Sequence, residues 1–448
     1  MFKIKRNNLI LLFIILFVLY TFFTFIRPYE DDESQYIRAG TAILNGKLNP
    51  FKVVYYKHYS NPFQYIMGSP LVPLIWGISY KVGGVIFVRV LATLFVVLSI
   101  LLVYNLIIKL GGDPIIPLIL IGFSSSTIAL ASDGLLDSVA LFFFISALYL
   151  IYTKKMVYAG LLSGLAMTSK FVLVIPIVII FIYQFFKKKG FQYLIGILVV
   201  VVPFLVLYKE LIPILVNFVL ITKVEGYSID KLITFLRIFF LALPITSIIV
   251  LSLIKSKKIR DYHIFLIPVI SIILFQIFLL DYNSLTRHLP YAEFSAAILL
   301  GLILKDKKIK YLWLLLILYL VVSISVAIKE VNDYPSYNLI EDNLDVVNGK
   351  ILALNLNSFM LIKNMPINST AENVFSYYYF NYDVTTDSKI EEYEQALKDG
   401  YFDYATISSY SPNKFSRYKM IEELVRKYYC PMLKSDKSNG IDIYKRCD

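Results

Sequence analysis

The sequence predicts a mainly α-helical protein that crosses a membrane about eleven times and carries a C-terminal α/β domain outside the membrane. Hydrophobic residues make up 58% of the 448 residues and charged residues only 17%, and the mean hydropathy is +0.68. Soluble domains are about 45–50% apolar and about 25% charged. Long apolar runs recur over most of the chain, and a polar stretch follows them. These observations exclude a soluble enzyme and a disordered chain.

Eleven apolar runs are candidate membrane spans, because most of them approach the length that a helix needs to cross the hydrocarbon core. They cover residues 9–26, 85–108, 114–131, 135–153, 157–169, 171–186, 191–207, 232–254, 264–280, 289–304 and 311–328. The first run is longer than the apolar region of a signal peptide, and no small-residue cleavage site follows it. We therefore expect it to remain as an uncleaved span.

The formal net charge of +12 indicates orientation, because the Lys and Arg residues cluster beside the apolar runs. With eleven spans, all main clusters fall on the same side of the membrane, which is the positive-inside pattern. The clusters lie at residues 3–6, 109, 154–155, 187–189, 255–260 and 305–310. We therefore predict a multi-pass plasma-membrane protein with a cytoplasmic N-terminus and an extracytoplasmic C-terminus. Nothing in this charge pattern suggests a nucleic-acid partner.

The chain divides by composition into two predicted domains. Residues 1–328 form the transmembrane domain, and its first outer loop, 27–84, carries amphipathic helices beside the membrane. Residues 329–448 form a soluble extracytoplasmic α/β domain, since this polar tail is long enough to fold by itself. In the tail we predict strands at Ile351–Leu354, Tyr404–Ser408 and Gly440–Tyr444, and helices at Ile390–Leu397 and Ser416–Tyr428.

Cysteine and histidine are scarce. Two cysteines and three histidines exclude a disulfide scaffold, an iron–sulfur site and a histidine-rich metal centre. Cys430 and Cys447 both lie in the predicted outer tail. An oxidising exterior permits a disulfide there, which would join the last strand to the helix before it; two free thiols are the alternative.

Four consecutive acidic residues, Glu30 to Glu33, directly follow the first span. Adjacent carboxylates repel one another, so their presence needs a reason. Asp31 or Asp32 can begin a helix, whose positive end favours acids. From Tyr36 onward, apolar residues recur at helical spacing and predict an amphipathic helix on the outer membrane surface. A helix start fixed there would also hold a catalytic carboxylate rigidly, so both interpretations stay open.

Other charged residues lie at the predicted outer ends of spans. They are Arg89, Asp137, Lys170, Arg287 and His288. Asp137 could cap a helix, Lys170 could extend to the lipid headgroups from the turn of a tight helical pair, and the arginines could be interfacial anchors. Charges beside apolar runs are costly, however, and are candidates for function. Arginine in particular binds phosphate through two parallel hydrogen bonds. Together they favour an outward-facing site for an anion such as a lipid phosphate.

An ordered set of motifs resembles the GT-C superfamily of glycosyltransferases, in the branch of the protein O-mannosyltransferases and the aminoarabinose transferase of lipid A. The matching segments are Asp32-Glu33-Ser34-Gln35-Tyr36, Asn45 to Phe51, Ser69-Pro70-Leu71, Gly83 to Arg89, Asp137 with Leu141-Phe142-Phe143, Gly160 to Lys170, and Arg287-His288-Leu289-Pro290. Two departures are Leu71 in place of a second proline and His288 in place of a tyrosine. The Trp-Trp-Asp signature of oligosaccharyltransferases is absent from the sequence.

The resemblance implies inverting transfer of a sugar from a polyprenyl-phosphate donor, such as dolichyl phosphate, at the outer face of the membrane. It implies Asp32 as general base, with the extra Asp31 as the other candidate, and Lys170 and Arg287 as groups that stabilise the phosphate. The remaining expected site residues are Asp137 and Glu33 on the catalytic side and Tyr36, Asp31, Arg89 and His288 on the substrate-binding side. No cofactor is required for this reaction, and a divalent cation is left open.

A lipid or solute transporter with a charged outer cavity is the alternative function. A transporter would more often show repeated halves and interrupted helices at mid-depth, and neither is evident in the sequence. Protein, lipid and glycan acceptors all remain open, as does the identity of the sugar.

Overall fold

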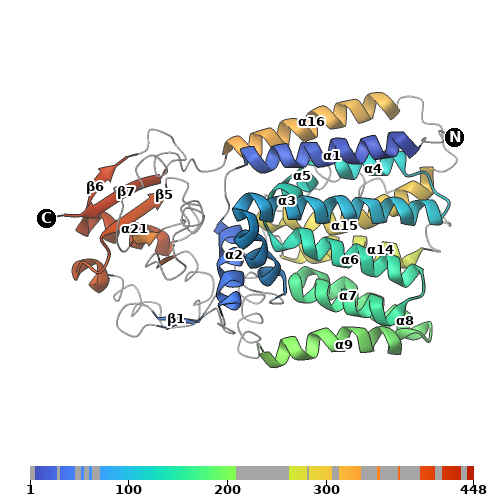
Figure 1. The fold of residues 1–448 in the computed structure, drawn as a ribbon, viewed down its shortest axis with the longest axis horizontal. Helices are drawn as coiled ribbons and strands as arrows, with labels where there is room; N and C mark the ends of the chain where they lie inside the picture. Colours follow the sequence, from blue (N-terminus) through green and yellow to red (C-terminus); the bar gives the residue numbers. More distant parts are fainter. Residues whose placement is uncertain are drawn as a thin grey trace. The chain divides into compact units, whose positions relative to one another are not determined.

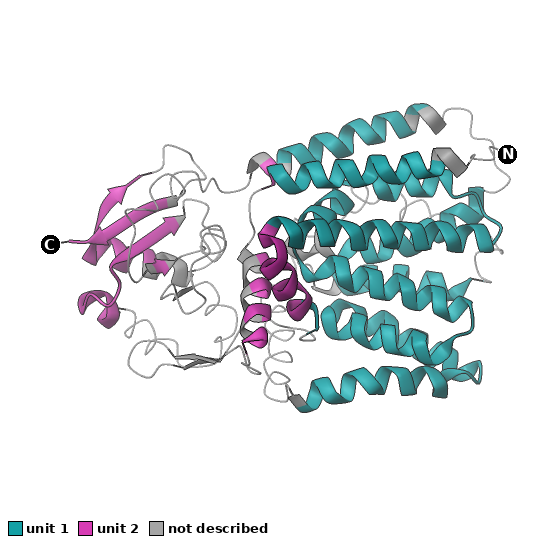
Figure 2. Cartoon of the chain, viewed as in Figure 1, with its two compact units in different colours: residues 1–26, 67–72, 86–329 teal, residues 27–66, 73–85, 330–448 magenta. Residues whose placement is uncertain are grey.

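The computed structural model describes the helical region and the core of a C-terminal sheet (Figure 1). The described residues are 6–27, 31–45, 52–54, 60–62, 71–207, 262–279, 282–304, 312–333, 351–353, 372–373, 394–408, 416–434 and 441–447. The chain divides into two compact units (Figure 2). Unit 1 comprises residues 1–26, 67–72 and 86–329, and unit 2 comprises residues 27–66, 73–85 and 330–448.

Unit 1 is a bundle of apolar helices. Its helices are α1 (Arg6–Ile26), the second part of α3 (Leu71–Lys109), α4 (Ile115–Gly122), α5 (Ser125–Ser132), α6 (Leu136–Tyr152), α7 (Met156–Ser169), the 3-10 helix η2 (Phe171–Leu173), α8 (Val174–Phe186), α9 (Gly190–Leu207), α14 (His263–Leu279), α15 (Tyr282–Leu304) and α16 (Leu312–Asp333). All predicted apolar runs except one coincide with these helices. The exception, 232–254, lies outside the described residues.

The described helices include strong candidates for membrane spans. By length and composition, α1 and α3 can each cross a membrane, and α4 with α5 form a third candidate that is bent by 60°. Helix α3 is kinked at Gly83 and Gly84, and Gly84 has a positive φ of 68°, which suits glycine. The other apolar helices of unit 1 are shorter. The chain is thus a membrane protein, and the number of about eleven crossings stays a prediction.

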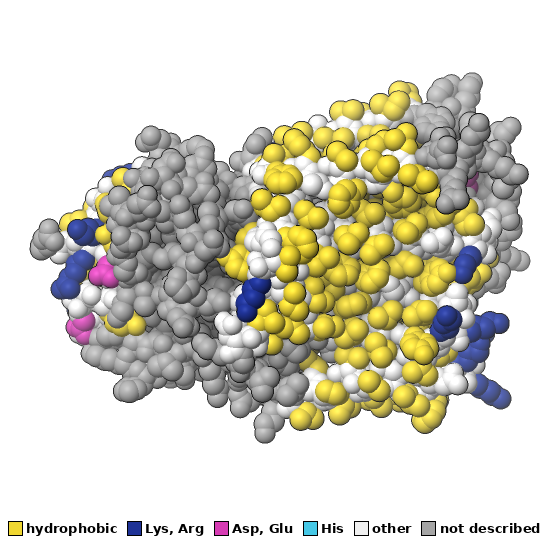
Figure 3. All heavy atoms as spheres, in the orientation of Figure 1, with side chains coloured by type: hydrophobic (Ala, Val, Ile, Leu, Met, Phe, Trp, Pro, Cys, Tyr) yellow, Lys and Arg dark blue, Asp and Glu magenta, His cyan; other side chains and the backbone are white. Residues whose placement is uncertain are grey.

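Basic residues gather at one end of the helical unit, whose visible face is otherwise covered by hydrophobic side chains (Figure 3). Lys109, at the end of α3, donates a hydrogen bond to the hydroxyl of Tyr149 on α6 (2.6 Å), and Tyr152 donates to the main-chain oxygen of Lys109. Helix α6 ends just before Lys154 and Lys155. Two of the predicted basic clusters therefore share one end of the bundle. The cytoplasmic orientation of that end stays a prediction.

Helix α7 packs mainly against α9, through glycines. A Cβ added at Gly160 would clash with the main-chain oxygen of Tyr193, and one at Gly196 would clash with that of Val157. The hydroxyls of Ser163 and Tyr193 are hydrogen-bonded across the same interface (2.6 Å). Small residues allow this close backbone approach between membrane helices. The predicted turn at Lys170 is present, since only this residue separates α7 from η2, which leads directly into α8. The main packing partner of α7 is nevertheless α9 rather than α8.

Unit 2 includes α2 (Asp31–Leu44), which contains Asp31, Asp32 and Glu33 of the acidic segment. The helix ends at Leu44, and the N–H of the next residue, Asn45, bonds to the oxygen of Thr41 (3.1 Å). Gly40 faces the first turns of α3, where an added Cβ would clash with the main-chain oxygen of Pro73. Two short antiparallel strands, β1 (Lys52–Val54) and β2 (Ser60–Pro62), follow α2 and were not predicted.

The C-terminal part of unit 2 contains a five-stranded mixed sheet of order β4-β3-β5-β7-β6. Its elements are β3 (Ile351–Ala353), β4 (Glu372–Asn373), β5 (Tyr404–Ser408), α21 (Ser416–Tyr428), β6 (Tyr429–Leu433) and β7 (Ile441–Arg446). Strand β3 runs parallel to β4 and β5, whereas β7 runs antiparallel to β5 and β6. A core of Leu352, Phe402 and Val425 joins the sheet to α21. Strands β3, β5 and β7 and helix α21 lie where the sequence places them; β4 and β6 were not predicted.

Cys430 and Cys447 form a disulfide, and no free cysteine exists in the chain. Cys430 lies in β6 and Cys447 follows β7, so the bond joins two neighbouring strands. The expected link between the last strand and a helix is wrong in this detail, because the preceding helix α21 ends at Tyr428 and β6 begins directly after it.

The α7–α9 interface yields a stability prediction. Gly160→Ala should lower the free energy of unfolding by about 1–3 kcal/mol, the usual cost of overpacking, because the new methyl group meets the backbone of α9. The thermal unfolding midpoint in detergent measures this change. Tyr158→Phe is the matched control on the same helix, since Tyr158 is exposed, and it should leave the midpoint unchanged. Equal midpoints for Gly160→Ala and the unaltered protein would contradict this packing.

Candidate functional site

The first site residue is Asp137, which lies in the first turn of α6. It is not the N-cap of the helix, since that position belongs to Leu135, and no side chain caps this helix end. The carboxylate is almost completely buried, with 2% of the side chain exposed. A buried carboxylate needs partners that replace its lost hydration. The capping explanation is therefore insufficient for Asp137.

Lys170 supplies one of these partners. It lies between α7 and η2, where the backbone is extended (φ −149°, ψ 114°) and its N–H bonds to the oxygen of Ala166. Its Nζ forms an ion pair with Oδ2 of Asp137 at 2.9 Å. The Lys170 side chain is 19% exposed. An ammonium group has three N–H donors, so it can bind Asp137 and still offer donors to an anion.

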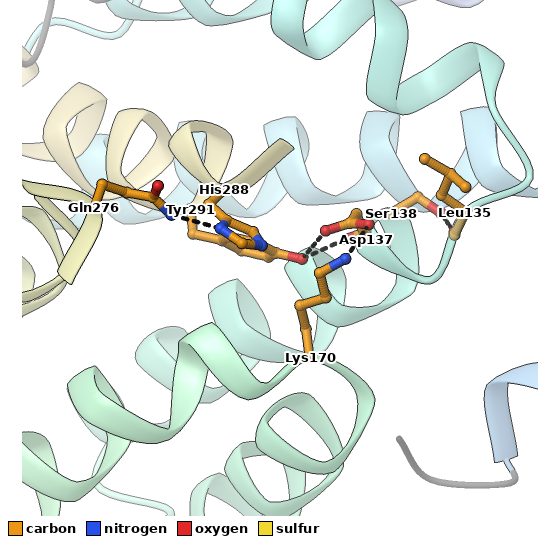
Figure 4. Close-up of polar contacts among 7 residues, drawn as sticks. All are labelled: Leu135, Asp137, Ser138, Lys170, Gln276, His288 and Tyr291. Atoms are coloured by element: carbon orange, nitrogen blue, oxygen red, sulfur yellow. Dashed lines mark hydrogen bonds and ion pairs between the residues drawn. The ribbon is translucent and has the colours of Figure 1, made fainter. Parts of the chain in front are cut away.

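Tyr291 of α15 supplies the second partner. Its hydroxyl donates to Oδ1 of Asp137 at 2.9 Å, so the two carboxylate oxygens are divided between Tyr291 and Lys170 (Figure 4). Tyr291 is fully buried, and its ring packs edge-on against Phe144 of α6. Tyr291 is not among the site residues predicted from the sequence. Its place directly after Pro290, next to a motif already selected, was the signal that could have indicated it.

His288 and Gln276 extend the polar group along α15 and α14. A ring nitrogen of His288 (Nδ1) is hydrogen-bonded to Nε2 of Gln276. In Figure 4, His288 and Tyr291 project from the same helix, and Tyr291 points toward the Asp137–Lys170 pair. Four helical segments therefore contribute polar side chains to one region of unit 1. The backbone of Arg287 continues α15, whereas its side chain lies outside the described part of the structure.

The acidic segment lies on α2 of unit 2. Asp31 and Asp32 form the start of the helix, as expected, and their side chains lie outside the described part of the structure. Glu33 is fully buried and Tyr36 is 8% exposed. Both make contacts within the protein. The catalytic and substrate-binding roles of Asp31, Asp32, Glu33 and Tyr36 stay predictions.

Arg89 has a structural contact that the sequence did not indicate. Only 1% of the residue is exposed, and its Nη1 donates to the main-chain oxygen of Thr24 at 3.1 Å. This bond joins α3 to the last turns of α1. The predicted role of Arg89 in substrate binding is untested. The hydrogen bond to α1 already gives the buried guanidinium group a structural role.

Metal binding is open. Among the residues that the structure describes, no group of three or more His, Cys, Asp or Glu side chains could hold a metal ion. The side chains of Asp31 and Asp32 lie outside the described residues. The divalent cation considered from the sequence therefore remains untested.

Two solved structures resemble the whole chain. Crystal structures of ArnT from Cupriavidus metallidurans, one bound to undecaprenyl phosphate and one in the apo state, match with TM-scores of 0.61 and 0.65. Each comparison has 12% sequence identity and covers 98% of both chains. The chain has the fold of ArnT. The predicted resemblance to an aminoarabinose transferase of the GT-C type is thereby confirmed in the fold.

The likeness to ArnT is a finding about structure. No protein-family model matches the sequence, and no curated protein matches it. The match over 98% of both chains therefore reflects a similar fold rather than closely similar residues. The ordered motifs of the sequence and the ArnT fold are two separate observations that agree.

The Asp137 contacts yield a second prediction. Lys170→Met should destabilise the protein by about 3–5 kcal/mol, because it leaves a buried carboxylate without its counter-ion. Tyr291→Phe should cost less, about 1–3 kcal/mol, since it removes one hydrogen bond. The measurement is unfolding in detergent for each variant.

The double variant Lys170→Met with Asp137→Asn separates pairing from packing. It should recover part of the loss, because the neutral amide no longer needs a cation. A double variant whose loss equals the sum of the single losses would contradict the ion pair. Tyr158→Phe again serves as the control, being an exposed tyrosine on the same bundle.

Proposed function

We propose that the protein is a membrane glycosyltransferase that moves a sugar from a polyprenyl-phosphate donor to an acceptor at the outer face of the plasma membrane. The likeness to ArnT over 98% of both chains carries this proposal. The ArnT crystal structure that contains undecaprenyl phosphate supports a polyprenyl phosphate as the lipid partner. The Asp137–Lys170 pair inside unit 1 supplies a partly exposed, oriented cation for that phosphate.

The chemistry of the donor explains the proposed roles of the cations. When the bond between the anomeric carbon and the phosphate oxygen breaks, its electron pair leaves with the phosphate. A phosphate is a weak base and leaves without being protonated, so no general acid is required. Positive groups that are already in place stabilise the charge that develops. Lys170 serves in this role, oriented by Asp137, and Arg287 adds a planar donor that suits phosphate.

One carboxylate then completes the reaction. Asp32 takes the proton from the acceptor hydroxyl or amine while the acceptor oxygen or nitrogen attacks the anomeric carbon. A single displacement of this kind inverts the anomeric centre, as with other one-step glycosyl transfers. Asp31 is the other candidate base, and Glu33 belongs to the proposed catalytic residues. Tyr36, His288 and Arg89 complete the proposed substrate-binding set.

The class of acceptor stays open between protein, lipid and glycan, and the sugar is not specified. A role as a transporter or flippase is less favoured, because the ArnT likeness points to transfer. The proposed reaction uses no organic cofactor. A divalent cation near the acidic segment would strengthen phosphate binding, and adding a chelator to the assay described below tests this.

Asp32→Asn should reduce sugar transfer by about 10²–10⁴-fold, the usual contribution of a general base. The assay uses the full-length protein in lipid nanodiscs with a radiolabelled undecaprenyl-phosphate sugar and measures release of undecaprenyl phosphate. Asp31→Asn should have a smaller effect. Glu394→Gln, in the C-terminal part of the chain, is a matched acid-to-amide control and should keep full activity. Transfer at the normal rate by Asp32→Asn would reject this residue as the base.

Arg287→Ala and Lys170→Met should both weaken use of the donor, because each removes a cation proposed to contact the phosphate. Binding of undecaprenyl phosphate to the nanodisc-embedded protein measures this effect without requiring turnover. Arg287→Lys should recover part of the affinity, since the charge is restored but the bidentate geometry is not. Unchanged affinity in Arg287→Ala would exclude Arg287 from the phosphate site.

A further inference from the structure

Gln276 is a buried amide inside an apolar helix. It lies on α14, whose residues are mostly aliphatic or aromatic, and only 1% of Gln276 is exposed. Ser271 of the same helix is satisfied locally, because its hydroxyl donates to the main-chain oxygen of Ile267 (2.7 Å). Gln276 instead reaches α15, where its Nε2 is hydrogen-bonded to Nδ1 of His288. A buried polar side chain of this kind is explained by what it contacts.

The Gln276 amide is only partly satisfied. Among the described residues, its Oε1 is buried and has no hydrogen-bond partner. A leucine or methionine at this position would avoid the cost of burying that oxygen. The stability of the bundle therefore does not account for Gln276, and its bond to His288 is the interaction that the amide provides.

His288 lies on the side of α15 that carries Tyr291. The two residues are three positions apart, so they occupy neighbouring places on one face of the helix, and both project from it in Figure 4. Tyr291 donates to Oδ1 of Asp137, whose Oδ2 binds Lys170. Tyr291 is fully buried, whereas His288 is partly exposed. His288 thus combines a place on this face with surface that a ligand can contact.

The amide determines where the His288 ring carries its hydrogen. An amide nitrogen has two N–H groups and accepts no hydrogen bond, so Nε2 of Gln276 donates and Nδ1 of His288 accepts. A ring nitrogen that accepts carries no hydrogen. The imidazole is therefore neutral, and its single N–H is at Nε2.

A neutral N–H donor suits a site that already contains an ammonium group. Lys170 supplies a full positive charge, and a second cation nearby would repel it. A neutral imidazole adds a directed hydrogen bond without adding charge. Fixed N–H groups of this kind, held by a residue behind them, stabilise negative charge that develops on an oxygen.

We propose that Gln276 is a positioning residue for sugar transfer: it holds the His288 imidazole with its hydrogen on Nε2, and this N–H donates to a phosphate oxygen of the lipid-linked sugar. The inference rests on the proposed function, since that phosphate is the ligand assigned to Lys170. Gln276 acts only through His288. Lys170 supplies the charge for the phosphate, and His288 supplies the direction.

Nitrogen-15 NMR of the histidine side chain tests the positioning without any sugar substrate. His58→Gln with His263→Gln leaves His288 as the only histidine of the full-length protein, and His263 is exposed. In lipid nanodiscs, His288 should show an unprotonated Nδ1 and a protonated Nε2, whose resonances are well separated. A protonated Nδ1 would overturn the proposal, because the amide would then present its oxygen to the ring.

Gln276→Leu, in the same background, removes the group that fixes the hydrogen. The two ring resonances should move toward each other, because the hydrogen then exchanges between the nitrogens. Ser271→Ala is the matched control on α14, since Ser271 bonds within its own helix, and it should keep the Nε2–H form. Unchanged ring resonances in Gln276→Leu would reject Gln276 as the positioning residue. If Gln276→Leu does not fold, the spectrum of the protein with Gln276 in place still decides the position of the hydrogen.

Binding of undecaprenyl phosphate to the nanodisc-embedded protein tests the ligand. His288→Phe should weaken binding at least about tenfold, as expected for a hydrogen bond to a charged group, and Gln276→Leu should weaken it by a smaller factor. The double variant should bind as weakly as His288→Phe, because Gln276 acts through His288.

Two results of the binding measurement would contradict the proposal. Losses that add in the double variant would show that Gln276 acts independently of His288. Normal binding in both single variants would exclude the bond from His288 to the phosphate. Lys170→Met then separates the two levels: weakened binding in this variant would leave the proposed function standing, whereas normal binding would reject the phosphate site itself.

Discussion

The burial of the Asp137 carboxylate is the constraint on which the helical unit depends. A charge with only 2% of its side chain exposed must be paired and hydrogen-bonded, or the fold loses several kcal/mol. Lys170 and Tyr291 meet this requirement from two further elements, each 2.9 Å from its own oxygen. Helices α6, α7 and α15 therefore have to converge on one point. Asp137, a candidate site residue, thus also constrains how these helices pack.

Other contacts between helices of unit 1 restrict the positions of the helices that carry these residues. Gly160 and Gly196 bring α7 against the backbone of α9, which sets the position of the chain just before Lys170. Arg89 ties α3 to the end of α1 through the oxygen of Thr24. The glycine contacts have no proposed chemical role, whereas Arg89 also belongs to the proposed substrate-binding set. They lower the freedom of the helices whose ends hold the charged groups, and such preorganisation is what an electrostatic role in transfer requires.

The sequence predicts the helices well because their apolar runs are long, and it selects Lys170 and Asp137 because charges beside apolar runs are few. It does not predict that the two form a pair, since the distance between residues on different helices depends on packing. Tyr291 and Glu293 were not selected for the same reason. An aromatic residue or a single acid inside an apolar stretch becomes a candidate only when the structure shows its partner, which is Asp137 for Tyr291 and Ser124 for Glu293. The partner of α7 was missed because glycine spacing reveals a flat surface without revealing which helix covers it. Strand β6 was missed because it begins directly after α21, with no turn residue between them.

The way in which the buried Asp137 carboxylate is balanced has a functional logic. Asp137 is balanced by an ammonium group that is partly exposed and has N–H donors to spare, so its counter-ion can also meet an incoming anion. A proton on Asp137 would weaken its hold on Lys170, because the ion pair needs the carboxylate. Tyr291 of α15 donates to the other carboxylate oxygen, so it supports the charged form of Asp137 without competing for the ammonium group. The same contacts that make the burial of Asp137 tolerable therefore keep Lys170 in place for an anion.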